Sequence, residues 1–450
     1  MTFDRIVAGR IVTPSGIIEA GWLAVADGSI AAVGSGADRP EAAETTDYGD
    51  AYILPGVIDG QTHAGSQIGF PGLGPTSRAA VMGGVTTIVD MPYDEPDPIT
   101  DGAVLARKVE AVGTHAVCDV ALYGTVTPVP DPAHVRELIE GGVCAFKISS
   151  FESHPVRFPR IDNGATLTLL KLLAGSGLPL GLHNEDQEIV RQTATTFISE
   201  GKIAPEFHST SRPEVAELTA TGNFLELGRG LGAHLHIVHI STPTGFGIVR
   251  QYREDGQLAT AEMCVHYLHF DGVADMKRLG GLLKVNPPIR PGYQEALWEV
   301  IDRGEATFVS SDHSAWPLSR KTNPSIFDVA AGMPGLEAML PVFFSDAVKR
   351  RGADEAALLS AELMGDKPAK FFSLSKKGRL APGMDADIAV LAPRPYVYDS
   401  KRNPEGPGWS AYDGETFAAT PVATYVRGAL AWDGEAVTAA PGSGRFVRRA

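Results

Sequence analysis

Short apolar runs alternate with longer amphipathic segments between about residue 55 and about residue 375. The apolar runs are YILPGVID, GVTTIVDMP, CDVALYG, VCAFKIS, LPLGLHN, AHLHIVHIS, QLATAEMCVHY and ATFVSSDH. Amphipathic segments such as GAVLARKVEAV, PAHVRELIEG and YQEALWEVIDRG follow most of them. Continuous apolar strands separated by helices indicate a parallel sheet that is covered on both faces. Eight such units over roughly 300 residues predict an α/β fold, a (β/α)8 TIM barrel. An open doubly wound sheet is the alternative, but no glycine-rich phosphate loop opens a helix.

Both ends of the chain have a different texture, with short β-like runs separated by glycine-containing turns. The N-terminal segment contains DRIVAGRIV and GWLAVADGSIAAVG, in which Asp27-Gly28 predicts a hairpin turn. The C-terminal segment contains KGRLAPGMDADIAVLAP and ATYVRGALAWDGEAV. Because the termini of a compact domain often lie close together, we expect residues 1–54 and 376–450 to form one small β-sandwich domain. Residues 55–375 would form the barrel.

Charge and cysteine content limit the classes of partner and compartment. The formal net charge of −15 argues against nucleic acid and against a membrane surface as partners. The three cysteines form no C-x-x-C pair, which predicts a reducing compartment and no thiolate zinc site. The first residues, MTFDRIVAGRIVTPSG, are not typical of a signal peptide, and no apolar run is long enough to span a bilayer. We therefore expect a cytoplasmic enzyme.

Polar side chains close five of the predicted strands. They are Asp59 with His63, Lys147, His183, His239 and Asp312. In a barrel, the carboxyl ends of all strands lie on one face, where barrel enzymes build their active sites. Each residue alone has an ordinary alternative role, such as a core histidine, a lysine that reaches solvent or a helix cap at Asp312. Their shared position at strand ends predicts one convergent site.

The lysine in this set requires a chemical explanation, because an ammonium group is repelled by a divalent cation. A buried lysine readily lowers its pKa, and its free amine can add carbon dioxide to form an anionic carbamate. The carbamate has two oxygens, which can bridge two metal ions. Lys147 would then be the centre of a metal site.

Sequence motifs spread over most of the chain resemble those of the cyclic amidohydrolases, which include allantoinases, hydantoinases, dihydropyrimidinases and dihydroorotases. These motifs are LPGVIDGQTH, GGVTTIVDMP, AFKIS, GLHNED, SRPEVAEL, HIVHIST, EMCVHYL, KVNPPIR, SDHSAWP and GRLAPGMDADIAVL. The resemblance implies a barrel with a β-sandwich built from both termini, and metal ions bridged by a carboxylated lysine. By position, Lys147 is the bridge, His183 and His239 bind the second ion, and His63 and Asp312 bind the first. Gln61 stands where the first ion's remaining histidine is expected.

The activity implied by the resemblance is hydrolytic ring opening of a cyclic amide by hydroxide generated on a metal ion. Asp312 would be the general acid and base. Asn286, in KVNPPIR, would bind the amide edge of the substrate, with a turn before two prolines as its ordinary alternative. The implied cofactors are one or two zinc ions, with manganese as an alternative, and carbon dioxide as the carbamate. A small cyclic amide and a second copy of the chain, in a homodimer or homotetramer, are the expected partners.

Three positions bear on the substrate. Gly65 stands where dihydroorotases have a carboxylate-binding arginine, which argues against dihydroorotate. The segment KISSFESHPVR has Phe151 and His154 but no tyrosine, whereas hydantoinases typically have a tyrosine shortly after the lysine. VDMPYDEP, SRPEVAEL and EMCVHYL are most similar to allantoinases, so an allantoinase-like hydrolase is the nearest class.

Gln61 leaves three outcomes open, because an amide oxygen is a weaker zinc ligand than imidazole. A two-metal site survives with Gln61 bound weakly or through water. Alternatively, one ion remains in the second site and Asp312 still acts in catalysis. In the third outcome, metal and catalysis are lost and the protein is a catalytically silent homologue that acts in binding or assembly.

Overall fold

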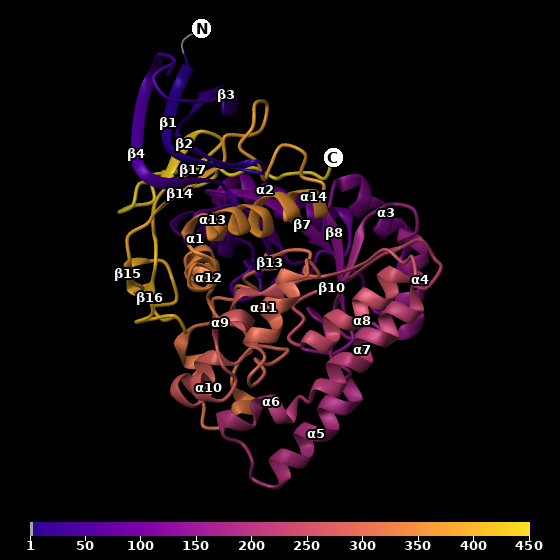
Figure 1. Cartoon of the computed structure of the whole chain (residues 1–450). Helices are drawn as coiled ribbons and strands as arrows, with labels where there is room; N and C mark the ends of the chain where they lie inside the picture. The colour runs from indigo at the N-terminus through magenta and orange to yellow at the C-terminus, as the bar shows by residue number, and fades with distance from the viewer. Residues whose placement is uncertain (1–2) are drawn as a thin grey trace.

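The computed structural model describes residues 3–450, which form a barrel and a terminal sheet (Figure 1). Seven parallel strands follow one another around the barrel in chain order. They are β5 (Val57–Thr62), β6 (Val85–Asp90), β7 (Asp119–Gly124), β8 (Ala145–Ser149), β9 (Pro179–His183), β10 (His234–Ile237) and β11 (Ala259–Ala261). After β11, β12 (Met263–Cys264) pairs with β13 (Val309–Ser310). A parallel bridge between Thr62 and His313 then returns to β5 and closes the ring, which confirms the predicted (β/α)8 barrel.

Helices separate the strands and cover the outside of the barrel (Figure 1). The helices of eight or more residues are α1 (Leu73–Met82), α2 (Gly102–His115), α3 (Pro132–Gly141), α4 (Asn163–Leu173), α5 (Gln187–Ser199), α7 (Glu214–Leu227), α8 (Pro243–Glu254), α11 (Gln294–Asp302), α12 (Leu336–Arg351) and α13 (Ala353–Ala361). The shorter ones are α6 (His208–Ser211), α9 (Val265–His269), α10 (Ala274–Leu279) and α14 (Lys367–Phe371). Asp101, Asp131, Asp162 and Asp186 each accept a backbone N–H bond at the start of a helix. Such caps satisfy otherwise unpaired N–H groups and define where these helices begin.

Burial explains why the barrel strands lack a simple polar-apolar alternation. Every residue of β5, β6 and β7 is buried, since the helices cover one face and the barrel interior covers the other. Charged residues in these strands are therefore paired within the fold, as Asp90 is with Lys108 of α2 and Asp119 is with Lys377.

The terminal sheet joins both ends of the chain, in the strand order β18-β17-β14-β4-β1-β2-β3. Its strands are β1 (Phe3–Thr13), β2 (Gly16–Ala26), β3 (Ser29–Ser35), β4 (Ala42–Pro55), β14 (Ile388–Ala392), β17 (Thr420–Val426) and β18 (Ala429–Trp432). The antiparallel pairing of β4 with β14 connects the two ends. A short hairpin, β15 (Tyr396–Val397) with β16 (Thr416–Phe417), lies outside this sheet. A division into domains after residues 54 and 375 stays a prediction.

Local and long-range packing both stabilise the terminal sheet. Asp27 and Gly28 have φ angles of 50° and 75°, as a tight two-residue hairpin between β2 and β3 requires. One apolar cluster combines side chains from both ends, among them Leu23 from β2, Ile53 from β4 and Ile388 from β14. The sheet therefore encloses a core of its own.

The last residues of the chain leave the terminal sheet and lie against the barrel. The backbone N–H of Val120 in β7 donates to Arg445 O at 2.9 Å, and Val447 N–H donates to Val120 O at 2.8 Å. The C-terminal segment thereby ties the sheet to the barrel.

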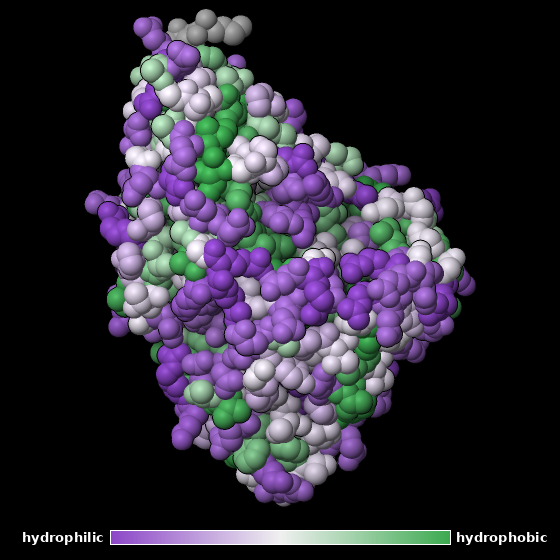
Figure 2. All heavy atoms as spheres, in the orientation of Figure 1, coloured by the Kyte–Doolittle hydropathy of each residue, from purple (hydrophilic) through white to green (hydrophobic). Residues whose placement is uncertain are grey.

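The visible surface is mainly hydrophilic in the orientation of Figure 1, with an apolar stripe near the top, where the terminal sheet lies (Figure 2). Within residues 3–450, no helix combines the length and apolar character that a membrane crossing requires.

Candidate active site

A cavity of about 470 Å³ opens at the carboxyl-end rim of the barrel. The structure brings all seven residues predicted for the site into its wall. They are Gln61, His63, Lys147, His183, His239, Asn286 and Asp312. Six of them lie on or just after barrel strands, because every parallel strand delivers its last residues to the same face, and Asn286 lies in the loop before α11.

Two of these residues have an unusual backbone. His239 follows β10 with φ 39°, and Asp312 follows β13 with φ 48°. Side chains other than glycine rarely adopt this left-handed region, and such strain is concentrated at functional sites. The backbone is therefore distorted at two of the predicted ligand positions.

His63 and Asp312 form the first pair of potential metal ligands. His63 Nε2 lies 3.3 Å from Asp312 Oδ1. The Ser66 hydroxyl donates to Tyr93 O at 3.1 Å, so its oxygen is free to accept His63 Nδ1–H at 3.2 Å. That bond leaves a lone pair on His63 Nε2 facing the Asp312 carboxylate. A proton or a metal cation between Nε2 and Oδ1 would stabilise this arrangement. Burial raises the pKa of Asp312, but the hydrogen bond and charge of His63, together with the charges of Lys147 and His266, outweigh burial and hold it below its ordinary value.

His183 and His239 form the second pair, with His183 Nδ1 at 2.9 Å from His239 Nε2. His183 Nε2 lies 2.9 Å from Glu185 Oε2. Arg212 donates to both oxygens of Glu185, at 2.7 and 2.5 Å. Burial raises the pKa of Glu185, but the charge and hydrogen bonds of Arg212 together with those of His183 outweigh burial and keep the pKa far below its usual range. Glu185 is therefore ionised and accepts a hydrogen bond from His183 Nε2–H. The lone pair of His183 Nδ1 then faces His239.

Lys147 lies in the middle of β8 and is only 1% exposed. Its Nζ contacts Met91 Sδ at 3.9 Å, and it forms no ion pair with the carboxylates of residues 3–450. Burial lowers its pKa to about 8, against the opposing charges of Asp312 and Glu262. A substantial fraction of free amine is thus available near neutral pH, as carboxylation requires.

Gln61 lies beside the first pair and is 1% exposed. Its Nε2 donates to Asp312 Oδ1 at 2.8 Å, across 251 positions of sequence. Its Oε1 is buried and accepts no hydrogen bond from the described part of the chain. The two ligand pairs, the Lys147 amine and this orphaned oxygen supply nitrogen and oxygen donors that fit divalent metal ions.

Three contributors to the site were not predicted from the sequence: Tyr93, Glu185 and Arg212. Glu185 and Arg212 lie within motifs typical of the family, but no spacing rule links them. Tyr93 lines the cavity, stacks on Phe158 at 3.7 Å between ring centroids, and is 3% exposed. Its hydroxyl is buried without a partner among residues 3–450, and burial raises its pKa well above the ordinary value. The Tyr93 hydroxyl is thus a neutral hydrogen-bond donor, and only its burial in the structure distinguishes it from a packing residue.

Two further positions shape the substrate side of the cavity. A Cβ atom at Gly65 would collide with the Asp94 carboxylate, which is occupied by Lys108 Nζ at 2.6 Å. An arginine at position 65 is therefore incompatible with this packing. Asn286 Oδ1 is buried and receives no hydrogen bond from the residues that the structure describes.

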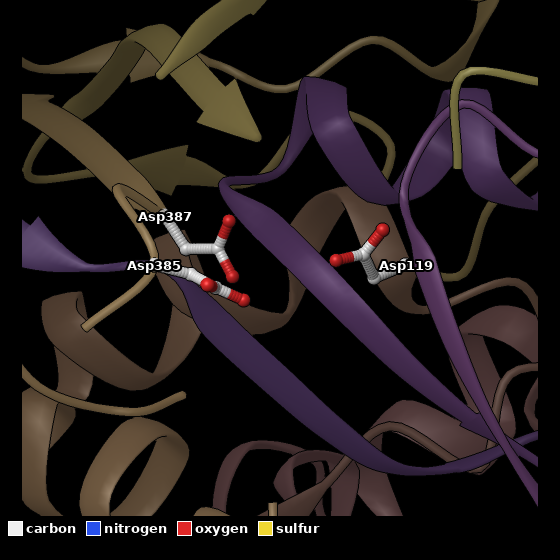
Figure 3. Close-up of side chains that lie close together, drawn as sticks. All are labelled: Asp119, Asp385 and Asp387. Carbon is white, nitrogen blue, oxygen red and sulfur yellow. The ribbon is translucent and has the colours of Figure 1, made fainter. Parts of the chain in front are cut away.

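A second acidic cluster lies where the barrel meets the terminal sheet. Figure 3 shows the carboxyl groups of Asp385 and Asp387 on one side and that of Asp119 on the other. Lys377 Nζ lies 2.6 Å from Asp119, 2.9 Å from Asp385 and 2.6 Å from Asp387, and Arg427 also pairs with Asp119. Burial lowers the pKa of Lys377, but these carboxylates raise it above its ordinary value. A lysine ammonium already occupies the place of a metal ion, so this cluster is an ion-pair network.

Comparisons with known proteins agree with this geometry. A scan against models of protein families returns no match. An allantoinase from Rubrobacter xylanophilus is 34% identical over 454 residues, which cover 99% of this chain and 98% of the relative. An L-hydantoinase from Paenarthrobacter aurescens is 30% identical, over 99% of this chain and 98% of the relative. The solved structure of an L-hydantoinase (dihydropyrimidinase) from Arthrobacter aurescens superposes with a TM-score of 0.93 at 29% identity and covers 100% of both chains.

The similarity extends over nearly the whole length of the chain and includes both the barrel and the terminal sheet. The resemblance drawn from the motifs is therefore confirmed. This chain belongs to the cyclic amidohydrolase family of the amidohydrolase superfamily, whose members are hydrolases that act on carbon–nitrogen bonds of cyclic amides.

Proposed function

We propose that this protein is a metal-dependent hydrolase that opens the ring of a small cyclic amide of the allantoin or hydantoin type. The observation that carries the proposal is the convergence of two facing ligand pairs on one cavity that also contains the buried amine of Lys147. Relatives named allantoinase and L-hydantoinase support the reaction class.

His183 and His239 would hold one divalent ion, and His63 with Asp312 would hold the other. Lys147, carboxylated on its amine, would bind both, with zinc as the expected metal. A divalent ion bound there acidifies water and polarises the substrate carbonyl. Glu185 and Arg212 act through His183, because they keep its Nδ1 unprotonated.

Asp312 would accept the proton of the attacking water and deliver it to the leaving ring nitrogen. Its lowered pKa keeps it ionised at neutral pH, as a base must be. Tyr93 would donate its O–H to the carbonyl oxygen as negative charge develops there, in place of the tyrosine missing after Lys147. Asn286 would bind the amide edge of the ring.

The cavity favours a ring without a carboxylate at the dihydroorotate position. Gly65 leaves no room for the arginine that binds this group in dihydroorotases, because Asp94 occupies the adjacent space. A cyclic amide without this carboxylate, such as a ureide, hydantoin, dihydropyrimidine or imide, agrees with this packing, and the named relatives favour the first two.

The alternative of a catalytically silent assembly protein is not supported. Five of the six predicted ligand positions hold metal-binding residue types, and the relatives are named as enzymes.

A screen of five- and six-membered cyclic amides tests the proposal. Metal-loaded protein is incubated with allantoin, monosubstituted hydantoins, dihydrouracil, dihydroorotate and cyclic imides, and the ring-opened product is measured. We expect turnover of allantoin or a hydantoin, none of dihydroorotate, and loss of turnover after chelation. Protein that binds metal and opens none of these rings would contradict the proposal.

A further inference from the structure

We infer that Gln61 weakens the zinc preference of the first metal position and shifts it towards hard, oxygen-preferring divalent ions such as manganese, while the second position retains its preference for zinc. This inference rests on the proposed function, since it assumes that both positions bind metal. It concerns which ion each position selects.

Three side chains meet at the first position. Asp312 Oδ1 lies 2.8 Å from Gln61 Nε2 and 3.3 Å from His63 Nε2. The side chain at position 61 therefore still reaches the site, although it is a glutamine and not a histidine. It lies close enough to Asp312 for both side chains to contact one ion.

The terminal amide of Gln61 has a hydrogen-bond donor, the NH2 group, and a hydrogen-bond acceptor, the oxygen. In the observed arrangement its N–H group donates to the carboxylate, and its oxygen is buried without a partner among the described residues. A half-turn of the terminal amide exchanges the two atoms and presents the oxygen to a cation between Gln61 and Asp312. The oxygen is left without a partner in the observed arrangement, which is costly for a buried polar atom, and a cation at the first position would supply a partner after the half-turn.

The donor sets of the two positions then differ in hardness. Apart from the carboxylated Lys147 that both positions would share, the first has an amide oxygen from Gln61, a carboxylate oxygen from Asp312 and a single imidazole nitrogen from His63. The second has two imidazoles, and Glu185 increases the basicity of one of them, His183. Imidazole ligands suit zinc, whereas carbonyl and carboxylate oxygens suit manganese and magnesium.

The metal affinity of the second position should not depend on the residue at position 61. Its histidines contact each other and Glu185, and neither forms a hydrogen bond with Gln61 in the described structure. A substitution at Gln61 should therefore alter the metal preference of the first position alone.

Competitive loading of the full-length protein tests the inference. Because zinc binds most sites more tightly than manganese, metal-free protein is incubated with a large excess of manganese over zinc in bicarbonate buffer, freed of unbound metal, and analysed for both elements. We expect about one zinc and about one manganese per chain. Electron paramagnetic resonance should show the hyperfine pattern of an isolated manganese ion, because its neighbour is diamagnetic zinc.

Gln61→His should replace manganese by zinc and shift the zinc-to-manganese ratio by about tenfold or more. Gln67→His is the matched control, because Gln67 lines the same cavity but bonds to Ser314 and not to Asp312. It should load metal as the parent protein does. Asp312→Asn should lose manganese and keep zinc, which assigns manganese to the first position even if Gln61→His folds poorly.

Two zinc ions per chain in the parent protein, or a single zinc ion without manganese, would overturn the inference while leaving a metal-dependent hydrolase intact. Protein that binds neither metal and opens no ring would instead refute the proposed function. An unchanged metal ratio in folded Gln61→His would also refute the role of Gln61.

Discussion

His183 Nε2 lies 2.9 Å from a carboxylate oxygen of Glu185, two residues further along the chain. The same carboxylate is held by Arg212, so it stays ionised although it is 1% exposed. This contact determines which nitrogen of His183 carries the proton. The tautomer that results places a free lone pair towards His239, as a ligand for a metal ion must have.

Glu185→Gln should therefore weaken zinc binding at the second position by about 10- to 100-fold. A neutral amide no longer neutralises Arg212 and no longer selects the correct His183 tautomer. The measurement is zinc affinity by competition with a chromogenic chelator. Glu188→Gln, an exposed change three residues away, is the matched control. Equal zinc affinity in the two variants would show that Glu185 has no such role.

Asp312→Asn should lower kcat by about 100- to 10,000-fold, because an amide cannot accept the proton of the attacking water and no longer supplies a carboxylate to the first metal position. The melting temperature should remain close to that of the parent protein. Steady-state kinetics and thermal unfolding provide the two measurements, and Asp255→Asn, at an exposed position, serves as the control. Retention of most of the activity would exclude Asp312 as the base.

Tyr93→Phe should lower kcat by about 100-fold, as expected for loss of one donor to a developing oxyanion. Metal content should not change, because the phenol is not among the proposed ligands. Tyr48→Phe removes a hydroxyl from the terminal sheet, where it bonds to Tyr425 at 2.6 Å, and should retain full activity. If Tyr93→Phe instead loses metal, its hydroxyl supports the ligands and not the reaction.

Lys147 should carry one carbon dioxide in the metal-loaded protein. Its pKa of about 8 leaves free amine at neutral pH, and the carbamate gains charge that the metal ions stabilise. Mass spectrometry under native conditions should detect the added mass, and Lys147→Met should lose both the adduct and the metals. Lys171→Met, on the exposed face of α4, should keep both. An unmodified mass in fully loaded, active protein would contradict the carbamate.

Glu337, at the start of α12, should make stability depend on pH. Burial raises its pKa from 4.5 to about 7, although Asn403 and Tyr398 donate hydrogen bonds to it. Between these values the folded state binds more protons than the unfolded state, so stability falls as pH rises from about 4.5 to about 7. The full effect is at most about 3 kcal/mol.

Glu337→Gln should remove this dependence, because the amide keeps an acceptor for Asn403 and cannot ionise. Chemical denaturation at pH 5 and pH 8 gives the free energy of unfolding of both proteins. Relative to the parent protein, the variant should be more stable at pH 8 than at pH 5. A constant difference between the two proteins across this range would mean that Glu337 does not titrate there.

Much of the site was predictable from single strands. The predicted strands ending near His63, Lys147, His183 and Asp312 all belong to the barrel, and their polar residues line one cavity. These residues meet in one cavity because a parallel barrel leaves no choice of face for its strand ends, and their roles stay a prediction. The hairpin at Asp27-Gly28 was predictable for a similarly local reason, since both residues tolerate positive φ angles.

Contacts between distant segments were not predictable in this way. Arg212 bonds to Glu185 across 27 positions, and Gln61 bonds to Asp312 across 251. Tyr93 was missed because a tyrosine after a strand is usually packing, and only the burial of its unpaired hydroxyl distinguishes it. The C-terminal segment also pairs with β7 and leaves the sheet in which its neighbours lie.

The sequence by itself determined the periodicity of the barrel, the rim on which its polar strand ends gather, and the family to which the chain belongs. Local residue patterns are sufficient for these features, because strand direction and turn chemistry act over a few residues. Only the tertiary structure decided how the ligands are paired, which nitrogen of His183 faces His239, and where the Gln61 amide points. These depend on side-chain rotamers and hydrogen-bond partners brought together by packing, which no local pattern encodes.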